Sequence, residues 1–136
     1  MSERTSYKDG AAVTIWSALG DTAIPVAADM VDTTDGAALA TAPAYGRPRQ
    51  WVVEITSTGA STITGSIWLC GWNGADWLQL AELNGGSNVV TTATLGYAEV
   101  LEDVGIYDYL GAYAAANTTG AGNVTMTITP IFETDG

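Results

Sequence analysis

Short runs of alternating apolar and polar residues recur through the second half of the chain, and they limit the folds that it can adopt. In residues 50–58, Trp51, Val53 and Ile55 stand at every second position, as in a β-strand that buries one face. Such runs return about every eight to twelve residues, separated by turns rich in glycine and asparagine, which is typical of antiparallel sandwiches and barrels. The regular runs cover residues 50–58, 61–72, 75–83, 87–95, 96–104, 105–116 and 123–132.

The N-terminal part of the chain is less regular. Residues 11–19 contain a short alternating run, and residues 23–28 predict a short edge strand, because Pro25 is tolerated mainly at sheet edges. In residues 29–49, Asp, Gly and Pro interrupt every periodicity, which predicts an irregular loop with a helical turn around residues 37–41. A loop of this length is usually functional or ordered by a partner.

The predicted fold is therefore all-β, an antiparallel, jelly-roll-like β-sandwich of about eight strands. We expect a single domain over residues 11–136, with the irregular loop 29–49 inside it. Residues 1–10 are mostly polar, and we expect them to form an extended N-terminal arm.

Five tryptophans are many for 136 residues, and either a core or a binding surface could use them. Trp68 and Trp72 lie on one predicted strand at positions that share a face. The Asn-Gly pair after Trp72 predicts a hairpin turn that brings Trp77 beside one of these two rings. We expect the three rings to pack in the core. The alternative is an exposed platform of Trp72, Trp77 or Tyr113 that stacks on sugar rings.

The distribution of ionisable residues excludes most enzyme mechanisms. The chain has no histidine, and no lysine or arginine follows Arg49. This stretch therefore offers no imidazole for proton transfer near neutral pH and no cation for a phosphate or an oxyanion. The net charge of −11 disfavours nucleic acid and anionic membranes as partners. The single cysteine, Cys70, has apolar neighbours and no base to activate it, which predicts a buried, unreactive thiol.

Two groups of carboxylates could in principle hold a calcium ion. The first could equally supply the paired acids of a glycosidase, and it consists of Glu99, Glu102, Asp103 and Asp108. The second lies in residues 29–36, where three aspartates stand three residues apart and do not match the alternate ligand positions of an EF-hand loop. Polar strand ends and turns explain both groups, so we expect no metal, no cofactor and no catalytic residue.

The order of the elements as a whole resembles a known group of proteins. The sequence runs WVVEITSTGASTITGSIWLCGWNGADWLQLAEL from Trp51, then a Gly-rich turn, then GYAEVLEDVGIYDYLGAYAAANTTGAGNVTMTITPIF to Phe132. It is similar to the small β-sandwich proteins of tailed-bacteriophage virions, namely capsid decoration (cement) proteins and related head or neck accessory proteins. The shared elements are a Gly-Trp-Asn-Gly-type hairpin, a Trp-Leu-x-Leu strand, a tyrosine-containing strand before a Gly/Thr loop and an alternating last strand.

The resemblance implies a non-enzymatic virion structural protein that docks on the lattice of the major capsid protein and stabilises it. It also implies neighbouring copies of the same chain as partners, often in a homotrimer, and a location on the capsid surface. The polar start lacks the apolar segment of a secretory signal, which agrees with assembly in the host cytoplasm. The alternative from another class is a carbohydrate-binding β-sandwich module of a virion fibre or adhesin.

The basic residues are confined to the predicted arm and to the end of the irregular loop. This asymmetry predicts that arm and loop dock on an acidic partner surface, where complementary charge would fix the register. Together with apolar residues of the same two segments, the docking candidates are Arg4, Tyr7, Lys8, Met30, Val31, Tyr45, Arg47 and Arg49.

Overall fold

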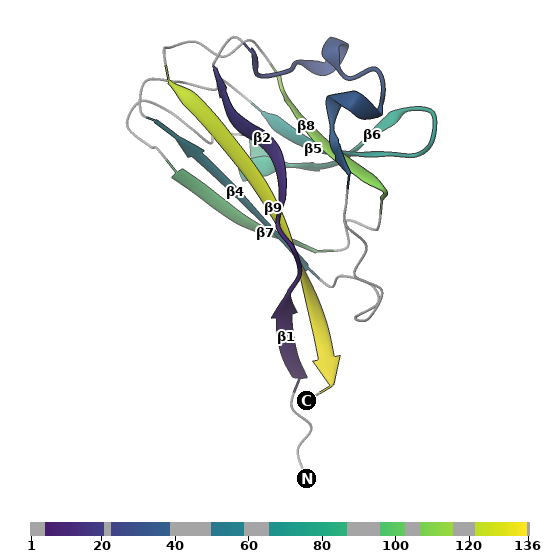
Figure 1. Cartoon of the computed structure of the whole chain (residues 1–136), viewed down its shortest axis with the longest axis vertical. Helices are drawn as coiled ribbons and strands as arrows, with labels where there is room; N and C mark the ends of the chain where they lie inside the picture. The colour runs from purple at the N-terminus through teal and green to yellow at the C-terminus, as the bar shows by residue number, and fades with distance from the viewer. Residues whose placement is uncertain are drawn as a thin grey trace.

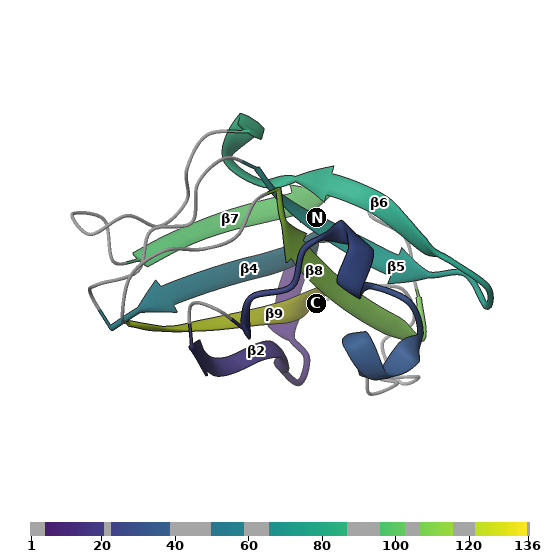
Figure 2. The ribbon, with the colours of Figure 1, turned by 90° about the horizontal axis from the view of Figure 1, so that it is seen from above.

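Two antiparallel β-sheets pack face to face in the computed structural model (Figures 1 and 2). It describes residues 5–20, 23–38, 50–58, 66–86, 96–102, 107–115 and 122–135, except for the side chains of residues 5–9 and 133–135. The strands are β1 (Thr5–Asp9), β2 (Val13–Gly20), β3 (Ala37–Ala38), β4 (Gln50–Ser57), β5 (Ile67–Trp72), β6 (Trp77–Glu82), β7 (Gly96–Glu102), β8 (Tyr109–Ala114) and β9 (Asn123–Asp135). The predicted all-β sandwich is confirmed, and the described residues contain no α-helix.

The first sheet is organised around its longest strand, β9, which has 13 residues. The strand order is β1-β9-β4-β7, and β2 shares one edge of β9 with β1. β2 pairs with the first half of β9, from Gly20↔Asn123 to Val13↔Ile128, and β1 pairs with the second half. β4 pairs with the other edge, so most of β9 has a neighbour on both sides.

The second sheet has the order β3-β8-β5-β6. Its hairpin between β5 and β6 turns at Asn73 and Gly74, as the sequence predicts, and the register pairs Trp72 with Trp77. Asn73 closes the turn, because its Oδ1 accepts hydrogen bonds from the amides of Ala75 and Asp76 at 2.8 and 2.7 Å. Gly74 has a φ of 101°, a conformation that favours glycine.

The core lies between the two sheets and is built from alternate residues of their strands. Trp51, Val53 and Ile55 of β4 are buried, which confirms the predicted alternation of residues 50–58. β9 contributes every second residue in the same way, and the facing sheet contributes the inner positions of β5 and β8. The residues of these three strands that form the core cluster are Val124, Met126, Ile128, Ile67, Leu69, Leu110, Ala112 and Ala114.

The tryptophans divide between this core and the outer face of the second sheet. Trp16 and Trp51 are core residues, each 2% exposed. Trp68, Trp72 and Trp77 are only half-buried, because other residues of β5 and β6, such as Leu69 and Leu80, pack in or against the core. The prediction that Trp77 pairs with one of the other two rings is correct, and its partner is Trp72, with ring centroids 5.4 Å apart and ring planes at 65°. The prediction that these rings pack in the core is wrong, since the pair lies outside the sandwich.

Residues 23–38 cover part of this outer face, and their local structure differs from the prediction. In place of an edge strand over residues 23–28, Val26 forms a single bridge to Ala114, and a 3-10 turn follows at Ala27–Asp29. A second 3-10 turn spans Thr33–Asp35. The short strand Ala37–Ala38 stands where the predicted helical turn begins. The rest of that predicted turn and the predicted strand over residues 87–95 lie outside the described residues.

Aspartate side chains account for these turns. Asp29 Oδ2 accepts a hydrogen bond from the amide of Val26 at 2.9 Å. Asp35 Oδ2 accepts from the amides of Val31 and Asp32 at 2.9 and 3.0 Å. Such local side-chain bonds give the backbone an alternative to a sheet ladder, which is why the segment folds into turns.

The two ends of the described chain form a ribbon that extends from the sandwich. β1 pairs with β9 from Asp9↔Ile131 to Thr5↔Asp135, whereas β4 reaches β9 only as far as Gln50↔Ile131. Beyond Ile131, β9 is therefore paired only with β1 among the described residues. Figure 1 shows these two strands, purple and yellow, projecting below the sheets. The described part of the predicted arm belongs to this ribbon.

Candidate functional site

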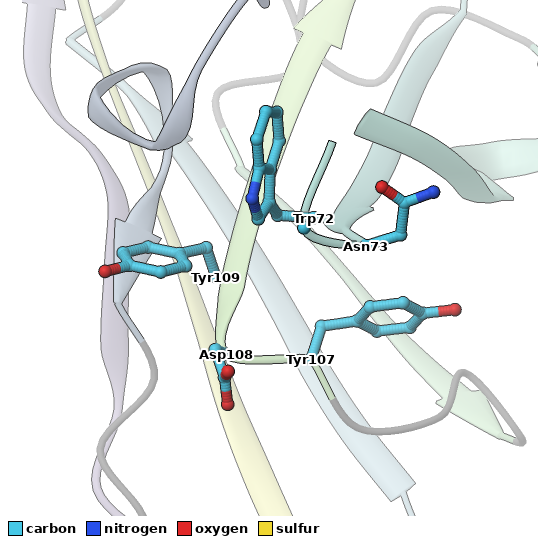
Figure 3. Close-up of a pocket in the computed structure, with 6 residues that line it drawn as sticks. Trp72, Asn73, Tyr107, Asp108 and Tyr109 are labelled. Carbon is cyan, nitrogen blue, oxygen red and sulfur yellow. The ribbon is translucent and has the colours of Figure 1, made fainter. Parts of the chain in front are cut away.

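A shallow depression opens at one end of the second sheet, beside the turn between β5 and β6 (Figure 3). Its volume is about 450 Å³, within the range of roughly 300–1,000 Å³ that is usual for small-ligand sites. The depression is open to solvent on one side. The residues that line it are Trp72, Asn73, Gly74, Tyr107, Asp108 and Tyr109.

The hairpin side of the depression is held in place by contacts behind it. The Trp72 ring meets Trp77 edge to face, and the indole Nε1 of Trp77 donates a hydrogen bond to the main-chain oxygen of Asp32 at 3.1 Å. Asn73 is fixed by the two backbone amides that its Oδ1 accepts. The aromatic surface of Trp72 is therefore oriented before any ligand arrives.

The other side is formed by the residues that lead into β8. The ring of Tyr107 packs on Gly71, where an added Cβ would lie only 2.6 Å from the ring. Tyr109 is the first residue of β8 and pairs with Ala38 of β3. Asp108 stands between the two tyrosines and is exposed. In Figure 3 the rings of Tyr107 and Tyr109 point to opposite sides, and the Trp72 ring stands above them and points away from Asp108.

This arrangement combines flat aromatic surfaces with a few hydrogen-bonding groups. Asp108 supplies the one charged side chain of the lining, a carboxylate that accepts hydrogen bonds. Asn73 supplies an amide, whose Nδ2 can donate to a ligand because its Oδ1 is held by the turn. Among the described residues, no lysine or arginine lines the depression. The chemistry of the site is therefore stacking and hydrogen bonding to an uncharged or cationic group.

The carboxylates that lie close in the sequence are separated in the structure. Glu99 accepts hydrogen bonds from the amide of Asn84 at 2.8 Å and from the hydroxyl of Tyr97. Glu102 accepts from Gln50 Nε2 at 3.0 Å. Asp108 lines the depression, and Asp103 lies outside the described residues. Within the described ranges, no group of three His, Cys, Asp or Glu side chains could hold a metal ion.

Cys70 of the second sheet and Tyr97 of the first sheet have pKa values above their ordinary values. Burial raises the pKa of the Cys70 thiol to about 12, and the side chain is fully buried. The prediction of a buried thiol is therefore correct. Burial and the hydrogen bond to the Glu99 carboxylate raise the pKa of Tyr97 to about 12 as well.

The docking candidates fall into different places. Val31 is 68% exposed at the bend between the two 3-10 turns, whereas the Met30 side chain lies over Gly111, 2.7 Å from where a Cβ would stand. Tyr7 and Lys8 belong to β1, opposite Glu133 and Phe132 of β9. The remaining candidates lie outside the described residues, namely Arg4, Tyr45, Arg47 and Arg49.

Sequence reasoning proposed part of the aromatic depression and missed the rest. Trp72 lines it, but Tyr113 is 9% exposed and accepts a hydrogen bond from Gln79, so it is not a platform. Tyr107 and Tyr109 are the tyrosines that line the depression. The tripeptide Tyr-Asp-Tyr, with aromatic groups on both sides of an acidic residue directly before a strand, is the signal that could have indicated them.

Two chains from structures of viruses are similar to this chain. No protein-family model matches the chain, and no curated protein matches it. Among solved structures, the chain is similar to one in the cryo-EM structure of mud crab dicistrovirus, at 9% identity and a TM-score of 0.30, over 96% of this chain and 70% of the other. It is also similar to a chain of the virus-like particle of the giant freshwater prawn (Macrobrachium rosenbergii) extra small virus, at 8% identity and a TM-score of 0.22, over 95% and 78%.

No helix in the described part of the chain is long and apolar enough to span a membrane.

Proposed function

We propose that this chain is a non-enzymatic structural protein of a virion, a decoration (cement) protein that docks on the major capsid protein lattice and stabilises it. The observation that supports the proposal most directly is the ribbon of β1 and the end of β9. It supplies a projecting element of the kind that the resemblance to decoration proteins implies for an N-terminal arm.

The ribbon by itself would be only marginally stable in water. Beyond Ile131 it consists of two strands with no further strand on either side in the described chain. Two-stranded ribbons are at best marginally stable, and their free edges readily pair with other chains. A partner that covers the ribbon would provide the missing contacts, and in this proposal the partner is the major capsid protein.

Two of the four basic residues, Arg4 and Lys8, lie in or next to β1. The ribbon also carries Asp9, Glu133 and Asp135, so it has no net positive charge. Arg4 and Lys8 would therefore act through local ion pairs with acidic groups of the lattice, which fix the register of docking. Many copies on one capsid, as neighbouring protomers or homotrimers, would turn modest single contacts into effective reinforcement. The resulting location is the capsid surface.

Co-sedimentation with empty capsids tests the proposal, with shells assembled from the major capsid protein encoded in the same genome. We expect stoichiometric binding by the full chain and loss of binding after deletion of residues 1–9. Circular dichroism should show that the sandwich stays folded in the deletion variant. A full chain that remains in the supernatant at every concentration would refute the proposal.

Two exposed valines provide a matched pair for the same assay. Val31 is a docking candidate and is 68% exposed, whereas Val100 is 54% exposed on the first sheet and is not a candidate. We expect Val31→Ser to lower the number of bound copies and Val100→Ser to leave it unchanged. Because both side chains are exposed, neither substitution should alter folding.

A further inference from the structure

We infer that the depression between Trp72 and Tyr109 binds a neutral saccharide. This inference rests on the geometry of the depression and does not depend on capsid docking. The aromatic surfaces, the charge of the lining and the openness of the site all support this ligand class (Figure 3).

The aromatic surfaces suit the faces of a pyranose ring. A sugar ring presents C–H groups on its faces, which pack on an aromatic ring, and hydroxyl groups around its edge, which need hydrogen-bond partners. The Trp72 ring is held by Trp77, so stacking on it would require little ordering of the protein. Asp108 can accept bonds from two hydroxyls, and Asn73 can donate one.

The charge of the lining selects among saccharides. Asp108 is the one acidic or basic side chain among the described residues of the lining. A sialylated or phosphorylated sugar would bring a second negative charge beside this carboxylate, and no described residue of the lining supplies a cation to compensate it. Uncharged sugars are therefore the favoured class.

A quaternary ammonium group is the main competing ligand, since aromatic rings and a carboxylate also attract cations. Recognition of such a group requires several rings that face one centre. Here the Tyr107 ring packs on the Gly71 backbone, and Tyr107 and Tyr109 point to opposite sides. The open, extended lining fits a flat ligand better than a compact cation.

The test begins with an array of neutral and sialylated oligosaccharides, followed by calorimetric titration of the neutral compound that gives the strongest signal. We expect at least tenfold weaker binding for Trp72→Ala and for Asp108→Ala. Trp68→Ala is the matched control, because Trp68 is also a half-buried tryptophan of β5 but does not line the depression. It should bind like the wild type. Asp108 is exposed, so its substitution tests the site even if Trp72→Ala unfolds the hairpin.

Three outcomes would overturn the inference. One is the absence of binding to any neutral oligosaccharide of the array. Another is wild-type affinity in the Asp108→Ala variant. The third is tighter binding of tetramethylammonium than of any saccharide, which would assign the depression to cations. Capsid co-sedimentation is unaffected by all three results, so failure here and failure of docking can be told apart.

Discussion

The indole Nε1 of Trp77 donates a hydrogen bond to the main-chain oxygen of Asp32 at 3.1 Å, joining β6 to a turn that lies 45 residues earlier. The same ring lies against Gly36, where an added Cβ would be 2.3 Å from its Cη2 atom. It also packs against Trp72 at the rim of the depression. One side chain therefore fastens the segment 23–38 to the outer face of the second sheet and supports the candidate site.

Replacing Trp77 by phenylalanine should lower the free energy of unfolding by about 1 kcal/mol more than Trp68→Phe does, because one hydrogen bond usually contributes about that much. Phenylalanine keeps an aromatic ring on the sheet, but it cannot donate to Asp32 and lacks the outer edge of the indole that lies against Gly36. Chemical denaturation measures the change, and Trp68→Phe controls for the loss of indole area on the same sheet. Equal losses in the two variants would show that the bond to Asp32 contributes nothing.

Gly36→Ala should destabilise the protein more than Gly111→Ala. At Gly36 a Cβ would meet the Trp77 ring at 2.3 Å and the main-chain oxygen of Leu110 at 2.6 Å, and the backbone cannot easily move. At Gly111 the closest atom is the flexible Cε of Met30, at 2.7 Å. We expect a loss of about 1–3 kcal/mol for Gly36→Ala, as for other overpacked sites.

Thermal unfolding of the two variants gives the comparison. Gly96→Ala is the control, because the nearest atom to its added Cβ would be 4.0 Å away. A larger loss for Gly111→Ala than for Gly36→Ala would contradict the packing of residues 23–38 on the sheet.

Alkaline pH should destabilise the protein through Tyr97. Its pKa is about 12 in the folded protein and 10.0 in the reference state, so the unfolded chain releases the proton first. The contribution to stability is complete below pH 10 and is lost as the pH rises to about 12. Denaturation curves between these values should have a shallower pH dependence for Tyr97→Phe. An unchanged slope would show that Tyr97 titrates normally.

The Cys70 thiol should resist alkylation in the folded protein. Its pKa is about 12, against an ordinary value of 9.0, and only the thiolate reacts with iodoacetamide. Mass spectrometry at pH 8 should show modification that is slow without denaturant and fast in guanidinium chloride. Rapid modification of the native protein would mean that the second sheet opens readily around β5.

The alternation of apolar and polar residues is sufficient to predict the strands that bury one face. Residues 50–58 were predicted as a strand, and β4 spans Gln50–Ser57. The last strand was predicted over residues 123–132 and extends to Asp135. Its additional residues pair with β1, a contact between the two ends of the chain that no local pattern indicates.

The turns of residues 23–38 could not be predicted from alternation, because hydrogen bonds from nearby backbone amides to aspartate side chains determine them. Asp29 and Asp35 serve as acceptors for their own turns, whereas their closeness in the sequence is also compatible with calcium ligands. The position of the tryptophan pair was missed for a related reason. Whether Trp72 and Trp77 face the core or the outer surface depends on which element covers the second sheet, and that cover is this irregular segment.

The candidate site was only partly foreseeable. The hairpin at Asn73 is a local feature, so the place of Trp72 beside a turn followed from the sequence. Tyr107 and Tyr109 approach it through the pairing of β5 with β8, which joins Gly71 to Leu110. Such pairing between distant strands is not encoded in any short motif.

The course of β9 also determines how the protein would respond to a pulling force. A load applied to the ribbon is transmitted along a continuous strand into the middle of the first sheet. The hydrogen bonds of an antiparallel ladder lie perpendicular to the strands, so this load acts on them in shear. Because β9 is paired with β2 on one edge and β4 on the other, many bonds would have to break together. An anchor built in this way yields at a higher force than a hairpin that opens one bond at a time.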